Sequence, residues 1–322
     1  MSELQGASIL ITGGTGSFGN AFVSYALEHL DPSRLVIFSR DELKQYEMRG
    51  RYGADPRLRF FIGDIRDRER LQRALHGVDY VVHAAALKQV DTAEYNPFEY
   101  VQTNVIGSQN VVDASIDSGV KKVVALSTDK ASSPINLYGA TKLTSDKLFV
   151  AANSYGYSYG TRFSVVRYGN VLGSRGSVVP YFKDLARSNK SIPITDERMT
   201  RFWITLPDAV EFVVNSFDQM NGGELYVPRI PSMKIIDLAK AIAPDCLTHE
   251  TGIRPGEKLH EEMISVDDAH RAVLVGDRYV IAPVLSSWGY TQPEGTQMPE
   301  GFAYRSDSND LWLTAEQINR LA

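Results

Sequence analysis

The chain has 322 residues, of which 43% are hydrophobic and 23% charged. These values lie near the averages of globular proteins and exclude a disordered, collagen-like or coiled-coil chain. With 34 basic and 39 acidic residues the formal net charge is −5, so there is no bulk positive field to bind nucleic acid or an anionic membrane.

The first half of the chain alternates short β-branched runs with longer amphipathic stretches, which is the pattern of a parallel sheet covered by helices. The runs are apolar enough to be buried on both faces. We predict strands at residues 8–12, 35–38, 58–62, 80–83, 122–126 and 163–167, and helices at 18–29, from 41 onward and at 97–118.

The second half is less regular, and at roughly 150 residues per domain the length predicts about two domains. Residues 169–180 have no clear period; we predict a strand or loop at 192–195, helices at 207–220 and 233–242, a strand at 224–227 and a loop at 291–301. The fold class is therefore α/β: a doubly wound parallel-sheet domain over 1–168, to which segments near 203–228 and 270–283 return, with a smaller interleaved carboxy-terminal domain over 169–322.

Several features bear on compartment and metals. The single cysteine, Cys246, excludes an internal disulfide and fits a reducing compartment. The first apolar run lacks the basic flank of a signal peptide, and no run approaches the roughly 20 residues of a transmembrane helix. The six histidines form no HxxH or HxxxH pair. We predict a cytoplasmic protein with no membrane partner and no metal.

A glycine-rich turn follows the first predicted strand and precedes a predicted helix. Gly13, Gly16 and Gly19 are spaced by three, which is typical of a Rossmann dinucleotide site, where backbone amides approach a pyrophosphate at a helix N-terminus. A plain glycine turn is the alternative. The predicted contacts within this turn also include Thr15, Ser17 and Phe18.

The end of the second strand distinguishes NAD from NADP in such folds. Ser39 stands where an acid would hold the ribose hydroxyls, and Arg40 and Lys44 are four residues apart, so two cations could flank a 2′-phosphate. Asp41 argues the other way, because it could hold ribose or cap a helix. We predict NADP, with the adenine contacted by Asp64 and Ile65.

Tyr138 and Lys142 are four residues apart on a predicted helix and so share a face. A nearby cation would lower the pKa of the tyrosine and make it a usable general base. Such a pair is expected by chance in this composition, but the polar run 127–130 precedes it at the end of the fifth strand, where ligands bind in open α/β sheets. A solvated turn is the alternative for that run.

The glycine turn, the segment His83–Ala86, Asn104 and the segment Tyr138–Lys142 together resemble the extended short-chain dehydrogenase/reductase family of nucleotide-sugar enzymes. Within that family, the segments 127–131, 169–180, 199–205 and 254–258 are similar to those of the soluble inverting UDP-N-acetylglucosamine 4,6-dehydratases. Retaining dehydratases carry Asp-Glu where this chain has Asp129-Lys130.

The resemblance implies a UDP-sugar substrate, a tightly bound and recycled NADP, and a 4-keto-6-deoxy product inverted at C5. Tyr138, its pKa lowered by Lys142 and the oxidised cofactor, would take the O4 proton, with Thr128 bonded to the same oxygen. Lys130, its pKa lowered by burial and nearby cations, would remove the C5 proton. Asp129, held protonated, would donate to the departing C6 hydroxyl.

The resemblance also assigns binding roles. It implies cofactor contacts from the segment after the fourth strand and from the following helix: Ala84, Ala85, Ala86 and Asn104. For the substrate it points to Asn170, Arg201 and Arg254, since guanidinium suits diphosphate. Lys88 is either in the site or a surface lysine. Glu257 and Lys258 are weaker candidates, with a helix-surface pair as the alternative, and Trp203 either shapes the sugar pocket or belongs to the core.

Two rival functions remain. Another nucleotide-sugar enzyme, such as a 4-epimerase or a retaining dehydratase, would share the cofactor residues, and Asp129-Lys130 argues against it. A non-catalytic NADP-binding sensor would be free to lose its base, whereas Tyr138 and Lys142 are both present. The resemblance further favours a homo-oligomer, either a dimer or a hexamer, and a pathway to a surface glycan such as pseudaminic acid or another deoxyamino sugar.

Overall fold

The computed structural model describes residues 2–174, 176–188 and 190–321. Within these residues the main element is a ten-stranded sheet in the order β16-β14-β15-β10-β6-β5-β4-β1-β2-β3. The run from β3 to β10 is parallel, and β15, β14 and β16 add antiparallel strands at the other edge. The strands are β1 (Ser8–Thr12), β2 (Arg34–Ser39), β3 (Leu58–Ile62), β4 (Tyr80–His83), β5 (Lys122–Thr128), β6 (Arg162–Tyr168), β10 (Leu225–Pro228), β14 (Ala272–Val275), β15 (Arg278–Ile281) and β16 (Thr296–Gln297).

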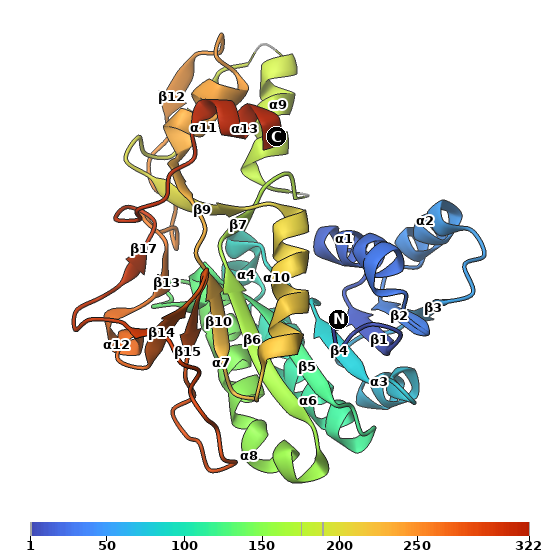
Figure 1. The fold of residues 1–322 in the computed structure, drawn as a ribbon. Helices are drawn as coiled ribbons and strands as arrows, with labels where there is room; N and C mark the ends of the chain where they lie inside the picture. The colour runs from blue at the N-terminus through green and yellow to red at the C-terminus, as the bar shows by residue number, and fades with distance from the viewer. Residues whose placement is uncertain (1, 175, 189, 322) are drawn as a thin grey trace.

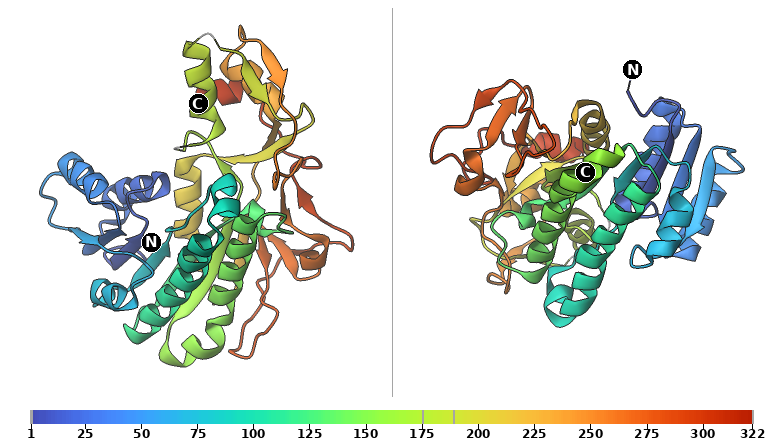
Figure 2. Two further views of the ribbon diagram at one scale, coloured as in Figure 1. Left: turned by 180° about the vertical axis from the view of Figure 1, so that it is seen from behind. Right: turned by 90° about the horizontal axis from the view of Figure 1, so that it is seen from below.

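Helices cover both faces of this sheet (Figures 1 and 2). On one face α1 (Ser17–Tyr25) packs against α10 (Leu206–Gln219), and on the other α6 (Gly107–Asp117) lies between α3 (Arg68–Leu75) and α7 (Leu137–Ala151). The strand order and the two helical layers confirm the predicted doubly wound α/β fold. The other elements of this part are α2 (Glu42–Tyr52), α4 (Val90–Tyr95), α5 (Pro97–Tyr100), α8 (Asn153–Gly156), the π-helical turns η1 (Ala26–Leu30) and η2 (Val101–Ile106), and the 3₁₀ turns η3 (Asp129–Ala131) and η4 (Tyr157–Tyr159).

Two predicted helices are interrupted. The helix expected over 18–29 continues past Tyr25 as η1, and the one expected over 97–118 is divided into α5, η2 and α6. In η2 the side chain of Asn104 leaves the helix surface to bond both backbone groups of Leu87, at 2.9 Å each. Such π-helical turns in helices frequently mark functional sites, and helical periodicity alone does not reveal them.

A smaller second part is formed mainly by residues after Tyr168 and lies above the sheet in Figure 1. Its core is separate and packs Trp203, Phe182 and Leu238 among other buried apolar side chains. Its strands are β7 (Asn170–Val171), β9 (Thr200–Ile204) and β11 (Ser232–Lys234) in one sheet, and β8 (Ile192–Ile194) with β12 (Thr248–Glu250). The pair β13 (Glu262–Ile264) and β17 (Tyr304–Arg305) also comes from this half of the chain, but its buried Met263, Ile264 and Tyr304 belong to the core of the large sheet. Its helices are α9 (Val178–Arg187), α11 (Ile235–Ile242), α12 (Val266–Ala269) and α13 (Ala315–Leu321).

The chain passes between the two parts several times. It returns to the large sheet with α10 and β10, and again with β14, β15 and β16. The return begins after residue 204, because β9 pairs with β7 and β11 in the smaller part. The helix predicted over 233–242 begins only at Ile235, since the preceding residues form β11, and the loop predicted over 291–301 contains β16. In the described residues, no helix has the length and apolar character needed to cross a membrane.

Candidate active site

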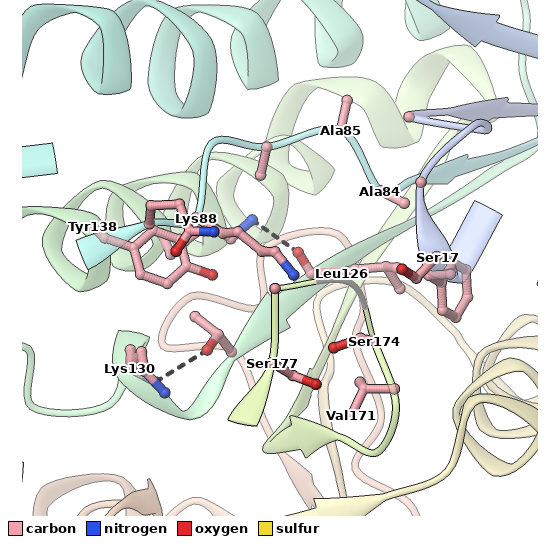
Figure 3. A pocket seen from close by; sticks show the side chains of 18 of the residues that line it. Ser17, Ala84, Ala85, Lys88, Leu126, Lys130, Tyr138, Val171, Ser174 and Ser177 are labelled. Atoms are coloured by element: carbon pink, nitrogen blue, oxygen red, sulfur yellow. Dashed lines mark hydrogen bonds between the residues drawn. The ribbon is translucent and has the colours of Figure 1, made fainter. Parts of the chain in front are cut away.

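A cavity of about 830 Å³ lies where the carboxyl ends of β1, β2, β4, β5 and β6 meet the smaller part. Figure 3 shows Tyr138, Lys88 and Lys130 toward one end and Ser17 and Ala84 toward the other, with Leu126 between them. The predicted site residues that line it are Gly13, Thr15, Gly16, Ser17, Phe18, Gly19, Ser39, Arg40, Lys44, Asp64, Ile65, Ala84, Ala85, Ala86, Lys88, Thr128, Lys130, Tyr138, Lys142, Asn170, Arg201, Arg254, Glu257 and Lys258. Asp129 and Asn104 do not line it.

The glycine turn between β1 and α1 forms one end of the cavity. Gly13 has φ +67°, and a Cβ there would lie 2.9 Å from the Ala85 backbone, so no larger residue fits the turn. Gly16 precedes α1 and makes no side-chain cap, and the N-terminus of a helix favours an anion. A backbone cradle of this kind fits the pyrophosphate of a dinucleotide.

A buried histidine fixes the strands beneath this cradle. The backbone amides of Ala84 and Ala85 each donate to Thr12 Oγ1 at 3.2 Å, and this hydroxyl lies 2.8 Å from His83 Nδ1. Because the Thr12 oxygen already accepts twice, its proton goes to Nδ1, and His83 Nε2–H faces the Ser108 hydroxyl at 3.4 Å. Burial, with a further contribution from the Lys142 charge, lowers the pKa of His83 to about 3. This histidine is neutral and structural.

At the adenine end, each predicted cation faces an acid. Lys44 Nζ lies 2.6 Å from Asp41 Oδ2, and Arg40 Nη1 lies 3.7 Å from Asp64 Oδ2. Asp41 also caps α2, accepting from the Lys44 amide at 3.0 Å, so the capping alternative weighed from the sequence holds. Ser39 Oγ accepts from Gln45 at 2.9 Å. Arg40 and Lys44 remain about half exposed and line the cavity.

Asn104 was predicted to contact the cofactor, and the structure places it elsewhere. Its amide donates to Leu87 O at 2.9 Å and to Thr141 Oγ1 at 3.1 Å, while its oxygen accepts from the Leu87 amide. All of these partners are protein groups, and Asn104 is only 2% exposed. Asn104 therefore fixes the loop after β4, which carries Lys88 into the cavity (Figure 3).

Tyr138 and Lys142 come from the first turns of α7, which Asn136 caps by accepting from the Gly139 amide at 2.7 Å. Lys142 Nζ donates to Leu126 O at 2.8 Å (Figure 3), and burial lowers its pKa. Burial raises the pKa of Tyr138 to about 12, against the opposing effects of the Lys130 charge and the Thr128 hydroxyl. The cation that opposes this rise is Lys130, so the structure does not support the predicted lowering of the Tyr138 pKa by Lys142.

Lys130 is held between two buried carboxylates. Its Nζ lies 3.1 Å from Asp129 Oδ1 and 3.2 Å from Glu261 Oε1, and Thr128 Oγ1 donates to the same Asp129 oxygen at 3.0 Å. Burial lowers the pKa of Lys130, but the two carboxylates outweigh it and the net shift is upward. This direction is opposite to the lowering predicted from the sequence. Burial raises the pKa of Asp129, the direction that favours its accepting a proton.

Glu261 was missed from the sequence. It lies three residues beyond the 254–258 segment, is 1% exposed, and reaches the cavity wall from the second half of the chain. Its Oε1 also lies 3.6 Å from Arg201 Nε. The closeness to a recognised motif was the only available signal, because nothing in the sequence indicates that position 261 meets position 130.

The predicted substrate residues of the smaller part are already engaged with protein groups. Arg201 is 5% exposed, and its Nη atoms donate to the carbonyls of Thr200, Leu259 and Lys258 at 2.7, 3.1 and 2.9 Å. Glu257 lies between Arg201 and Arg254, at 3.4 and 3.9 Å. Arg254 is more than half exposed and is the freest of these groups to meet an anion.

The same side of the cavity is also lined by Lys258 and by residues of the segment 169–180. Lys258 Nζ donates to Ser132 O at 2.6 Å, and Glu257 and Lys258 lie in a loop, so the helix-surface alternative is wrong. Ser174 and Ser177 point toward the cavity beside Val171 (Figure 3). Arg175 of the same segment lies outside the described residues. Trp203 is 1% exposed and belongs to the second core.

Comparison with known proteins identifies the family of this chain. A sequence profile described as polysaccharide biosynthesis protein matches residues 9–283. The chain belongs to the polysaccharide biosynthesis protein family. The chain is 54% identical, over 97% of its length and 96% of the relative, to a Campylobacter jejuni subsp. jejuni serotype O:2 protein named UDP-N-acetylglucosamine 4,6-dehydratase (inverting). It is 44% identical, over 85% of its length and 82% of the relative, to a Rickettsia canadensis protein named UDP-glucose 4-epimerase.

Solved structures agree. The structure of Pen from Bacillus thuringiensis is similar to this chain, with a TM-score of 0.91 and 36% sequence identity, and the match covers 99% of this chain and 97% of Pen. DesIV, a dTDP-glucose 4,6-dehydratase from Streptomyces venezuelae solved with NAD and TYD bound, has a TM-score of 0.71 and 26% identity, covering 78% and 86%. These matches confirm the family resemblance predicted from the sequence.

Proposed function

We propose that this protein is a UDP-N-acetylglucosamine 4,6-dehydratase that inverts C5, giving UDP-2-acetamido-2,6-dideoxy-β-L-arabino-hex-4-ulose. The Campylobacter relative named for this reaction supports the proposal. The deciding observation is the position of Lys130, whose ammonium touches the Asp129 carboxylate within a cavity that also holds Tyr138. An acid and an amine in contact beside a tyrosine suit proton removal and water loss, whereas a 4-epimerase requires no such pair.

The Rossmann cradle fits a nicotinamide dinucleotide, which Gly13, Gly16 and Ser17 would hold by their backbone. When bound, this cofactor supplies a hydride acceptor for C4 and returns the hydride to C6. Tyr138 takes the O4 proton, and Thr128 bonds the same oxygen. The Lys130 charge lowers the Tyr138 pKa from the high value that burial sets.

The elimination step uses the Asp129–Lys130 pair. Lys130 passes its proton to Asp129 across their 3.1 Å contact, and the neutral amine then removes the C5 proton, which the C4 ketone has acidified. The sequence predicted that Asp129 donates directly to the C6 hydroxyl. Because Asp129 lies behind the cavity wall, we instead assign it the role of proton store, and the proton for the departing water passes through Lys130. A proton from solvent then reaches C5 from the opposite face, which gives the inverted sugar, and Tyr138 releases the O4 proton to solvent, so the site returns to its starting state.

We further propose that the cofactor is NADP and that it stays bound through the cycle. Arg40 and Lys44 line the cavity at the end of β2, and no acid occupies the Ser39 position that normally holds the ribose hydroxyls. The test is to unfold the purified protein and identify the released nucleotide by chromatography. Release of NAD alone would contradict this assignment. The cytoplasmic location, the homo-oligomer and the glycan pathway stay predictions.

The reaction is tested by incubating the purified protein with UDP-N-acetylglucosamine in deuterated water, without added cofactor, and following the sugar by proton NMR. We expect a 4-keto-6-deoxy product with deuterium at C5 and inverted C5 coupling. A retained C5 configuration would indicate a retaining dehydratase. C4 epimerisation alone would favour the activity for which the Rickettsia relative is named, and no reaction even with NADP supplied would favour a sensor.

A further inference from the structure

The contact between Glu261 and Lys130 joins the two halves of the chain at the cavity. Lys130 follows β5 of the large sheet, and Glu261 immediately precedes β13. The 3.2 Å distance between Lys130 Nζ and Glu261 Oε1 nearly equals the 3.1 Å distance to Asp129 Oδ1. One ammonium is therefore shared by two carboxylates, one from each half of the chain.

The backbone around Glu261 is held on both sides, so its side chain has little freedom to withdraw. The Glu261 amide donates to Ser306 Oγ at 2.9 Å, and the Ser306 amide donates to Glu261 O at 2.8 Å. Two residues further on, Met263 O accepts from Arg167 Nη1 at 3.0 Å, and Arg167 is itself paired with Asp146 in the core at 3.2 Å. Glu261 thus occupies a fixed position relative to β6 and α7.

The two carboxylates are unequal in surroundings. Asp129 lies behind the cavity wall, while Glu261 lines the cavity and has a second cation, Arg201, at 3.6 Å. Among the described residues, Asp129 Oδ2 and Glu261 Oε2 are both buried without a hydrogen-bond partner. Two buried negative charges around one ammonium are costly, and the site reduces that cost when Asp129, whose only ion pair among the described residues is with Lys130, accepts a proton.

We propose that Glu261 is a positioning residue for the Asp129–Lys130 pair, holding the Lys130 ammonium at the cavity so that one proton stays shared between Lys130 and Asp129. This inference rests on the proposed dehydratase function for its catalytic meaning. In the shared state, transfer of that single proton from Lys130 to Asp129 creates the free amine and the stored proton in one step. If the shared proton is lost to solvent, Lys130 is a neutral amine but Asp129 stores no proton, so no proton is available for the departing C6 hydroxyl.

The charge of Glu261 sets the pH at which the pair loses its proton. Burial lowers the pKa of Lys130, the two carboxylates and Tyr138 raise it, and Arg201 lowers it. Lys88 and Lys258 also lie within electrostatic reach of Lys130. Because an anion next to an ammonium raises its pKa, neutralising Glu261 lowers it, and the pair then loses its proton at lower pH.

Glu261→Gln tests the proposal because it keeps the size of the side chain and removes its charge. Glu262→Gln is the matched control: it removes the neighbouring charge, and Glu262 binds the hydroxyls of Ser132 and Ser133 at 3.2 and 2.7 Å instead of Lys130. Glu261→Asp keeps the charge and tests rescue. Circular dichroism establishes that each variant is folded.

The first measurement needs no substrate. An amine reacts with acetic anhydride only when neutral, so the acetylation of Lys130, followed by peptide mass spectrometry against pH, reports its protonation. We expect Lys130 to become reactive about one to three pH units lower in Glu261→Gln than in the wild type, and at the wild-type pH in Glu262→Gln and Glu261→Asp. An unchanged profile in Glu261→Gln, or an equal shift in Glu261→Asp, would overturn the proposal.

The second measurement is C5 deuterium exchange from UDP-N-acetylglucosamine against pH. We expect the alkaline loss of exchange to move to lower pH in Glu261→Gln by the same interval as the acetylation profile. Arginine does not titrate in the pH range of this measurement. A disturbed Arg201 would therefore weaken substrate binding without shifting the pH at which C5 exchange is lost. Absence of exchange in the wild type would refute the proposed function, while the acetylation profile would still decide the role of Glu261.

Discussion

The two ends of the cavity are built on different principles. At the cofactor end, the cradle is backbone: a left-handed glycine, a close approach between Gly13 and Ala85, and an uncapped helix start. At the junction with the smaller part, the site is a cluster of charges contributed by Lys130, Arg201 and Glu261, which lie far apart in the chain. A cradle of backbone can be encoded in one short segment, whereas a charge cluster exists only once distant segments have folded together.

Two lysines make the difference concrete. Lys142 faces the Leu126 carbonyl, and burial lowers its pKa, while Lys130 faces two carboxylates that raise its pKa despite burial. Both line the same cavity. Burial alone therefore does not set the direction in which the pKa of an amine shifts at this site; the groups around the amine decide it. The following predictions test this contrast, beginning with the largest effect.

Lys130→Ala should slow C5 deuterium exchange by about 10²- to 10⁴-fold, the usual contribution of a general base, and slow C4 oxidation by a smaller factor, because it also removes the charge that lowers the Tyr138 pKa. Tyr138→Phe should instead slow C4 oxidation by a similar factor. Proton NMR in deuterated water measures the exchange, and absorbance of the reduced nicotinamide measures the oxidation. Lys121→Ala, which removes an exposed partner of Asp79, should change neither. Wild-type C5 exchange in Lys130→Ala would refute the role of Lys130.

Gly139→Ala tests how tightly the catalytic turn is packed. A Cβ at Gly139 would lie 2.1 Å from the Lys130 carbonyl oxygen, so the turn that carries Lys130 has to move. We expect a loss of about 1–3 kcal/mol in unfolding free energy and a fall of about 100-fold in dehydration, with the cofactor retained. Gly50→Ala, in open space on α2, should instead stabilise by about 0.5–1 kcal/mol. Urea unfolding distinguishes the two, and equal activity in both variants would contradict the prediction.

His83 predicts how the cofactor end responds to acid. Its folded pKa of about 3 lies below the ordinary value of 6.5, so the unfolded chain binds the proton first. The stability that neutral His83 contributes is therefore lost as the pH falls from 6.5 toward 3, with a slope of at most about 1.4 kcal/mol per unit. Urea unfolding of His83→Gln at neutral pH and about two units below should show a smaller decline than the wild type. Exposed His76→Gln should decline as the wild type does.

Arg40→Ala and Lys44→Ala should each weaken NADP binding by about tenfold and leave NAD binding unchanged. The effect is modest because both cations are half exposed and already face acids. Calorimetric titration of nucleotide-free protein measures both affinities. Arg49→Ala is the control on the same helix, since Arg49 stacks on Phe60. Equal weakening of NAD and NADP in the first two variants would show that they act on a part common to both cofactors.

The sequence predicted the cofactor half more fully than the junction, and the reasons are physical. β1 and β4 are buried runs, and β1, β3 and β4 were predicted to the residue. The expectation that every run is buried on both faces is wrong for β3, which lies at the edge of the sheet and exposes Arg59 and Ile62. The π-helical turn at Asn104 was missed because its cause is a tertiary bond to Leu87.

Motif resemblance found Lys130 and Arg201. It could not give the partner Glu261, because that contact joins residues 131 positions apart. The direction of the Lys130 pKa was also missed, because both the adjacent Asp129 and the distant Glu261 raise it.

The separation between Lys130 and Glu261 has a consequence for the order in which the enzyme is made. Chains emerge from the ribosome amino-terminus first, and their early portions fold first. The glycine turn, Tyr138, Lys142 and Lys130 all leave before position 261, and β14 to β16 of the large sheet leave later still. A nascent chain therefore exposes its cofactor cradle and its lysine while the second carboxylate is still unmade. The charge cluster of Lys130, Arg201 and Glu261 can therefore be completed only after the residues of the cofactor end have been synthesised.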